Sequence, residues 1–290
     1  MKRFSLSLLA LGVTAGTAFA QSAWLPAEGE LLLTPGYTFF TFDKFLVGEQ
    51  QVTALKDNGA RWNQHAGYIS TEYGVTPKLA ADLTLGYVRA DTGDFAGFGR
   101  TSTDGLADTS IGLRYQLLNE GESGNAWTPT VAIRVGAIIE GTYKVDYAAP
   151  LNVGDGASGF ETSLLFGKQI GDSGFGLFGD IGYRWRSQDV PEDIFGSAGV
   201  FQRLGGFTLS AAYRHTQGLS GGDIGGPGFG ATYGFPQVRE ISQLIEGGLG
   251  YTDKGGRTYQ FTVAQKIAGR NTGEKFVLGF AITLPFQLGK

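Results

Sequence analysis

Apolar and polar residues alternate with a period of two along most of the chain. In the stretch TDGLADTSIGLRYQLL (103–118), one face carries Ile111 and Leu113, whereas the other carries Asp108 and Arg114. This alternation predicts β-strands with one apolar and one polar face, and no convincing helical period of 3.6 residues interrupts it. The pattern predicts twelve strands, at residues 30–42, 60–73, 79–90, 105–118, 127–140, 158–169, 175–187, 194–204, 207–217, 238–252, 257–268 and 275–288.

The connections between these strands alternate in length. One series is compact and rich in Gly, Pro, Asn and Asp, as tight turns require. It comprises residues 74–78, 119–126, 171–174, 205–206 and 253–256. The other series holds the long connections, at 43–59, 91–104, 141–157 and 218–237, with the shorter 188–193 and 269–274. An all-β, up-and-down antiparallel barrel with tight turns at one end and long loops at the other gives this rhythm, which a Greek-key sandwich does not.

Charged residues keep to one face of the predicted strands. Within the bodies of nine strands the apolar faces carry no Asp, Glu, Lys or Arg, and the glutamines Gln243 and Gln265 are polar exceptions there. The opposite faces hold thirteen charged residues, which are predicted to face the barrel lumen. They are Asp82, Asp108, Arg114, Arg134, Glu140, Glu161, Asp180, Arg184, Arg186, Arg214, Glu246, Lys266 and Lys275.

Three features favour a transmembrane barrel over a soluble β protein. The strands mostly reach ten residues or more, close to the about 9–11 that a membrane-crossing strand needs. Aromatic residues such as Tyr87, Tyr115 and Trp185 lie near strand ends on the apolar face, as interfacial girdles require. Glycine is frequent on the polar faces, where a closed barrel has little room. A secreted soluble β protein remains the alternative interpretation.

The N-terminus predicts export. Lys2 and Arg3 precede an apolar run, and Ala18-Phe19-Ala20 fits a signal-peptidase site, so residues 1–20 are predicted to be a signal peptide of the general secretory pathway. A membrane anchor is the alternative, although the apolar run is short for one. Residues 21–29 then form a short N-terminal segment, and residues 30–290 form the barrel. The predicted location is the outer membrane of a diderm bacterium, with outer-membrane lipid and lipopolysaccharide as partners.

Composition excludes several kinds of chemistry. The chain has no cysteine, and its net charge of −4 gives no basic surface for nucleic acid. His65 and His215, the only histidines, share the apolar parity of their strands and are predicted to face lipid. No metal-ligand spacing is visible, so neither an enzyme nor a cofactor is expected. The glycine-rich stretch 221–234 lacks the helix of a phosphate loop and is predicted to be an external loop that could cap the pore.

The predicted lumen charges have two interpretations. Strand direction places Arg114, Arg134, Asp180, Arg214 and Glu246 near mid-depth, and Arg214 and Glu246 could pair across neighbouring strands. The residues predicted to cluster towards the outer end of the lumen are Glu140, Glu161, Arg184, Arg186, Lys266 and Lys275. Seven basic and six acidic residues nearly cancel, which favours a salt-bridged network that stiffens the wall. The alternative is a constriction that orders a polar group of a permeant. A twelve-stranded lumen could conduct, or side chains and residues 21–29 could block it.

The stretch DGLADTSIGLRYQLL (104–118) resembles the family named for the MetA pathway of phenol degradation. The start of the mature chain, AWLPAEGELLLTPGYTFFTFDKF, and TEYGVTPKLAADLTLGY are similar to the same family. The resemblance implies an outer-membrane transporter, distantly like the fatty-acid and aromatic-hydrocarbon channels, that takes up small, often hydrophobic molecules. The alternating Phe and Leu of FVLGFAITLPFQLGK resemble the C-terminal signal that the barrel-assembly machinery reads. Two alternatives are a closed structural or adhesive barrel with partner-binding loops, and an outer-membrane enzyme acting on lipid.

Overall fold

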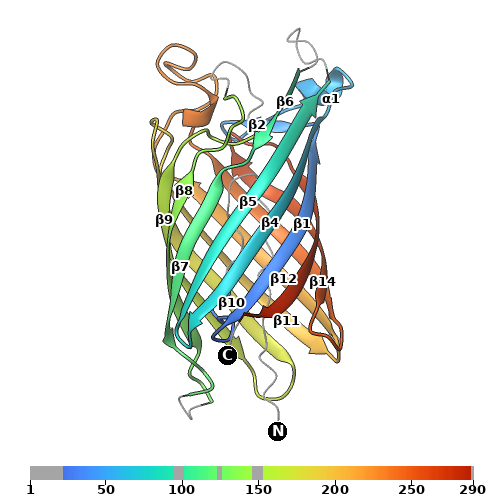
Figure 1. Cartoon of the computed structure of the whole chain (residues 1–290). Helices are drawn as coiled ribbons and strands as arrows, with labels where there is room; N and C mark the ends of the chain where they lie inside the picture. Colours follow the sequence, from blue (N-terminus) through green and yellow to red (C-terminus); the bar gives the residue numbers. More distant parts are fainter. Residues whose placement is uncertain (1–21, 94–100, 123–125, 146–152, 289–290) are drawn as a thin grey trace.

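A computed structural model describes residues 22–93, 101–122, 126–145 and 153–288. Twelve antiparallel strands close into a barrel, with β6 and β7 occupying one position in the wall (Figure 1). The all-β fold predicted from the alternation is confirmed. The predicted signal peptide at residues 1–20 lies outside the described residues.

The strands follow one another around the wall in chain order. They are β1 (Glu30–Phe42), β4 (Trp62–Thr76), β5 (Leu79–Thr92), β6 (Thr101–Leu106), β7 (Thr109–Leu118), β8 (Thr130–Ile139), β9 (Gly159–Gln169), β10 (Phe175–Arg186), β11 (Asp193–Leu204), β12 (Phe207–Gly218), β13 (Ile241–Thr252), β14 (Thr258–Arg270) and β15 (Phe276–Gln287). The last strand returns to the first, with Leu31 opposite Phe286 and Thr41 opposite Phe276. Closure therefore leaves neither β1 nor β15 as a free edge.

The two ends of the barrel differ, as the connection lengths predict (Figure 1). At the turn end, β1 begins, β15 ends and short turns join the strands. At the loop end, the connection between β1 and β4 carries the hairpin β2 (Phe45–Val47) and β3 (Gln50–Val52) and the short helix α1 (Ala54–Asp57). The connection between β12 and β13 carries a 3₁₀ turn, η1 (Phe235–Gln237). The alternation did not predict these loop elements.

The predicted strand 105–118 is interrupted in the structure. β6 ends at Leu106 and β7 begins at Thr109, and β6 extends four residues into the predicted loop 91–104. The Asp108 carboxylate accepts hydrogen bonds from the Gly141 amide at 3.0 Å and the Tyr143 hydroxyl at 2.7 Å. The Thr142 amide donates to the Leu106 carbonyl at 3.0 Å. The segment after β8 thus bonds to the end of β6 in place of β8 itself.

Other strand boundaries differ by a few residues. The predicted strand 127–140 begins only at Thr130, because Pro129 has no amide hydrogen to give to the ladder. The predicted strand 238–252 begins at Ile241, since Val238 forms an isolated bridge with Gly222 in the loop. The predicted strand 60–73 runs to Thr76.

The two faces of the wall follow the predicted alternation. On β7, outward Ile111, Leu113 and Tyr115 are 48%, 50% and 49% exposed. Inward Arg114 and Gln116 on the same strand are only 1% and 5% exposed. A continuous apolar outer surface of this kind suits a hydrocarbon surrounding. Among the described residues, no helix is long and apolar enough to cross a membrane.

Ile111 provides a direct test of the lipid-facing surface. It lies four residues from Tyr115 and pairs with Leu83, which lies four residues from Tyr87, so it is midway between the two aromatic levels. We expect Ile111→Arg to lower the free energy of unfolding in lipid vesicles by about 2–4 kcal/mol, because it places charge at mid-depth. Leu117→Arg, near the turn end of the same face, should cost only about 0–1 kcal/mol. Denaturant titration in vesicles measures both, and equal costs would contradict a lipid-facing surface.

Candidate functional site

One register row on the inner wall carries three acidic residues, one arginine and two glycines. Six residues of neighbouring strands lie opposite one another in this row: Asp82, Gly112, Gly136, Glu161, Arg184 and Asp193. The two central members are glycines, which have no side chain to separate the acidic residues on either side. The row is therefore open on β7 and β8, and a side chain from another level can enter it.

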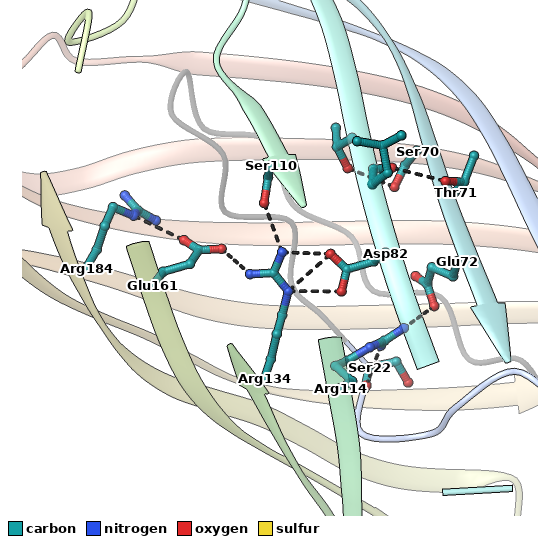
Figure 2. Close-up of polar contacts among 12 residues, drawn as sticks. Ser22, Ser70, Thr71, Glu72, Asp82, Ser110, Arg114, Arg134, Glu161 and Arg184 are labelled. Carbon is teal, nitrogen blue, oxygen red and sulfur yellow. Dashed lines mark hydrogen bonds and ion pairs between the residues drawn. The ribbon is translucent and has the colours of Figure 1, made fainter. Parts of the chain in front are cut away.

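Arg134 fills that opening. Its guanidinium lies between Asp82 on β5 and Glu161 on β9 (Figure 2). Nε lies 3.0 Å from Asp82 Oδ1, Nη2 lies 2.7 Å from Asp82 Oδ2, and Nη1 donates to Glu161 Oε1. Nη2 also donates to Ser110 Oγ at 2.9 Å. A Cβ at Gly112 or Gly136 would stand 2.6 Å from guanidinium atoms, so both glycines are needed for this close approach.

Burial makes the pairing at Arg134 obligatory. Arg134 is 1% exposed and Glu161 is 4% exposed, so neither charge is solvated by bulk water. A buried ion that loses its partner is strongly destabilising, whereas a matched pair is tolerated. The Arg134 cluster (Asp82, Ser110, Arg134, Glu161) is therefore a fixed part of the wall that also narrows the lumen at this level.

The cluster continues towards the loop end. Arg184 Nε donates to Glu161 Oε2 at 3.2 Å, and Arg184 Nη1 lies 3.5 Å from Asp193 Oδ2. Arg186 Nη1 lies 2.7 Å from Asp155 Oδ2 and 3.6 Å from Asp108 Oδ2. Ion pairs thus run without a gap from Asp82 through Arg134, Glu161 and Arg184 to Asp193.

The other predicted lumen residues lie in separate groups. Arg214 and Glu246 form an ion pair at 3.1 Å across β12 and β13. Asp180 accepts a hydrogen bond from Ser197. Lys266 donates to Thr272, whose hydroxyl donates to Glu240 at 2.7 Å. Glu140 stands apart, because it lies past the end of β8, is exposed, and accepts a hydrogen bond from Gln188 at 3.0 Å.

An N-terminal segment, residues 22–29, enters the turn end of the lumen. Arg114, 1% exposed, donates from Nη1 to the Ser22 carbonyl at 2.7 Å and pairs with Glu72 (Figure 2). Trp24 donates from Nε1 to Glu120 at 2.8 Å, and a side chain at Gly167 would clash with its ring. Ala23 is buried against Ala132 and Leu165 of the inner wall. The segment therefore occupies part of the lumen below the Arg134 cluster.

An aromatic cavity of about 150 Å³ lies at the loop end of the lumen. Its wall includes Phe40 and Phe42 of β1, Trp62 of β4 and Phe235 of η1. The sequence reasoning missed this cavity. The signal was present, since Phe40, Phe42 and Trp62 share the inward parity of their strands and so place aromatic rings on a polar face.

The glycine-rich loop between β12 and β13 covers this cavity. Ile224 and Phe235 line it from above, and the loop is tied to the β14–β15 connection through Asp223. The Asp223 carboxylate accepts hydrogen bonds from Arg270 Nε at 2.7 Å and from Asn271 Nδ2 at 2.9 Å. These hydrogen bonds lower the pKa of the Asp223 carboxyl below its ordinary value.

The histidines lie away from the lumen. His65 Nδ1 is 2.5 Å from the Tyr37 hydroxyl, and His215 Nδ1 is 3.4 Å from the Tyr213 hydroxyl, both on the outward face. Within the described residues, no cluster of three or more His, Cys, Asp or Glu side chains could hold a metal ion.

A double-mutant cycle tests whether the Arg134 guanidinium packs against Gly136. Gly136→Ala should destabilise the barrel, because its Cβ displaces a guanidinium held by Asp82 and Glu161. In the Arg134→Met background the same change should cost far less, since no guanidinium remains to be displaced. Gly250→Ala, whose nearest neighbouring atom is 3.7 Å away, is the matched control. Unfolding free energies in vesicles give the coupling between the two substitutions. Additive costs would contradict the packing of Arg134 against Gly136.

The hydrogen bonds of Asp223 predict that the stability of the loop between β12 and β13 depends on pH. Because the folded pKa is lowered, the ionised carboxylate stabilises the folded loop above the ordinary aspartate pKa. That contribution is lost as pH falls through the lowered value. Amide exchange of residues 222–238, normalised to intrinsic rates at each pH, should therefore accelerate under acidic conditions. Asp223→Asn should flatten this dependence, and an unchanged acid response in the variant would assign it to another group.

Solved structures show the same fold. The COG4313 outer membrane channel from Pseudomonas putida F1 is 16% identical, with a TM-score of 0.69 over 90% of this chain and 97% of that chain. The deltaS2 mutant of the TodX monoaromatic hydrocarbon channel is 11% identical, with a TM-score of 0.50 over 91% of this chain and 92% of that chain. At these identities the likeness concerns the fold. No curated protein sequence matches the chain.

A family model covers most of the sequence. The model is described as "Putative MetA-pathway of phenol degradation" and matches residues 43–282. This range includes the stretch DGLADTSIGLRYQLL, on β6 and β7, and every strand of the wall except β1 and the end of β15. The chain therefore belongs to the MetA-pathway of phenol degradation family.

Proposed function

We propose that this protein is an outer-membrane channel for the passive uptake of small hydrophobic or aromatic molecules. The observation that carries the proposal is the aromatic cavity at the loop end of a closed barrel with an apolar outer surface. The free energy of a small apolar molecule falls when it leaves water for such a cavity. The cavity therefore suits the first step of uptake.

The proposed orientation follows the connection lengths. In outer-membrane barrels the short turns lie on the periplasmic side and the long loops lie outside. The loop end would then face the medium, among lipid and lipopolysaccharide, and the turn end would face the periplasm. Export by the general secretory pathway, with residues 1–20 as signal peptide, and insertion by the barrel-assembly machinery belong to the same proposal.

The proposed route runs from the aromatic cavity past the Arg134 cluster to the N-terminal segment. Because Arg134 and Arg184 lie between the carboxylates of Asp82, Glu161 and Asp193, the wall presents no strong field of one sign to a passing molecule. A ring of one sign selects among ions, so the balanced charges here fit a route for uncharged molecules. Trp24 and Ala23 would form the last narrowing before the periplasm. No catalytic step is part of the proposal.

A closed structural or adhesive barrel is the second candidate. It is favoured by the buried Arg114 and Arg134, which fill lumen space, and by the N-terminal segment that enters from below. Under this interpretation the loops would bind external partners, and no molecule would cross.

Single-channel recording in planar bilayers, with liposome swelling, separates the two candidates. We expect the protein to conduct and Trp24→Ala to raise the conductance, because the indole occupies the turn end of the lumen against Gly167. Trp127→Ala is the matched control, since Trp127 is 84% exposed, and its conductance should equal that of the parent. Absence of conductance and swelling in the protein and in Trp24→Ala would overturn the channel and favour the closed barrel.

A further inference from the structure

Connections at the loop end cover the aromatic cavity. Ile224 lines the cavity from the β12–β13 connection, Leu55 from the β1–β4 connection and Asn271 from the β14–β15 connection. Side chains of the wall are buried beneath them, with Leu55 1% and Trp62 3% exposed. The contacts between these connections therefore decide how readily a molecule from outside enters the cavity.

The side chain of Asn271 joins three connections. Its Oδ1 accepts hydrogen bonds from the Gly48 amide at 2.8 Å and the Ile224 amide at 3.2 Å. Its Nδ2 donates to Asp223 Oδ1 at 2.9 Å and to the Arg239 carbonyl at 2.8 Å. A side-chain amide has two acceptor sites and two donors, and all four are used here. One residue of the β14–β15 connection thus holds the β1–β4 and β12–β13 connections together.

Burial makes this amide a stronger link than the ion pairs beside it. Asn271 is 6% exposed, so breaking its hydrogen bonds leaves buried polar groups unpaired. Arg270 also bridges the two connections, with Nη1 2.9 Å from Glu49 Oε1 and Nε 2.7 Å from Asp223 Oδ1. The Glu49 side chain is 75% exposed, however, and an exposed ion pair contributes little to stability.

Residues 223–224 are the part of the cover that can move. They lie between Gly221 and Gly225, whose φ values of 89° and 72° are in the left-handed region that glycine adopts without strain. The β1–β4 connection has backbone support of its own, since the Leu46 amide donates to the Thr272 carbonyl at 2.9 Å. Residues 223–224 can therefore rotate about the two glycines while the β1–β4 connection stays in place.

We propose that Asn271 is the latch of a lid, residues 221–225, that closes the aromatic cavity. When the hydrogen bonds of Asn271 are made, Ile224 lies on the cavity. When they break, the lid turns outward and the cavity opens to the medium. The proposal deepens the proposed channel function, on which it rests, because the lid would control the first step of uptake. Opening of the lid requires only the folded barrel, so it can be measured without transport.

Quenching of Trp62 fluorescence by acrylamide tests the latch. The chain has four tryptophans, so replacing Trp24, Trp127 and Trp185 by phenylalanine leaves Trp62, in the cavity wall, as the only one. In detergent micelles this Trp62-only parent should be quenched slowly. Asn271→Gly in the same background should raise the quenching constant about tenfold, because losing the hydrogen bonds of a buried amide shifts the lid equilibrium by about that factor.

Glycine is the informative replacement at position 271. Asn271 has a φ of 51°, so glycine removes the amide and leaves the backbone unstrained. Asn58→Gly is the matched control, because Asn58 lies in the β1–β4 connection and its side chain donates to the Ala54 carbonyl of α1 at 2.7 Å. The control should leave the quenching constant unchanged.

Asn271→Asp is a second variant that keeps the shape of the side chain. Its carboxylate cannot donate to Asp223 or to the Arg239 carbonyl, so the quenching constant should again rise. Retained heat-modifiable gel mobility establishes that each variant is folded.

Three outcomes would overturn the latch: ready quenching of Trp62 in the Trp62-only parent, an unchanged quenching constant in both folded Asn271 variants, or an equal rise in Asn58→Gly. Failure of the channel is a separate result. A protein whose Trp62 becomes accessible in Asn271→Gly and that never conducts keeps the lid and refutes transport. A protein that conducts with unchanged quenching in the Asn271 variants keeps transport and refutes the lid.

Discussion

The structure depends on one constraint: in hydrocarbon, every backbone amide and carbonyl of the wall must find a partner within the protein. The pairing of β1 with β15 meets this constraint by closing the sheet. Closure then sets the two faces of the wall: at the depth of the hydrocarbon, outward residues must be apolar and charged side chains must turn inward. The lumen of twelve strands is then narrow, so buried charges have to pair with one another instead of with water.

The Arg134 cluster is the consequence of that crowding. Two glycines opposite each other on β7 and β8 remove side chains from a register row, and the guanidinium takes their place between Asp82 and Glu161. The same ion pairs divide the lumen. Above them lies the aromatic cavity at the loop end, and below them lies the N-terminal segment held by Arg114. Wall stability and the proposed route therefore use the same residues.

Much of this fold could be predicted from the sequence, because a period of two is a local pattern and turn residues mark the ends of strands. The Arg214–Glu246 pair also follows, since β12 and β13 are neighbours in the chain. The partners of Arg134 could not be predicted, because they span β5 to β9 and depend on the register of several strands. The break at Ala107–Asp108 depends on Tyr143 in a distant loop, and the aromatic cavity is completed by four connections. Such long-range contacts leave no periodic signal, although the inward aromatic rings of β1 and β4 that line the cavity do.

Spin labelling along one strand distinguishes a closed barrel, with a lipid-facing and a lumen-facing side, from a sheet that is exposed to water on its apolar face. The chain contains no cysteine, so single cysteines can be introduced along β7 and labelled without background. In vesicles, oxygen accessibility should be high at Ile111, Leu113 and Tyr115 and low at Ser110 and Gln116, with a period of two. Oxygen accessibility without alternation, or equal access of a water-soluble nickel reagent to the outward positions, would contradict the account.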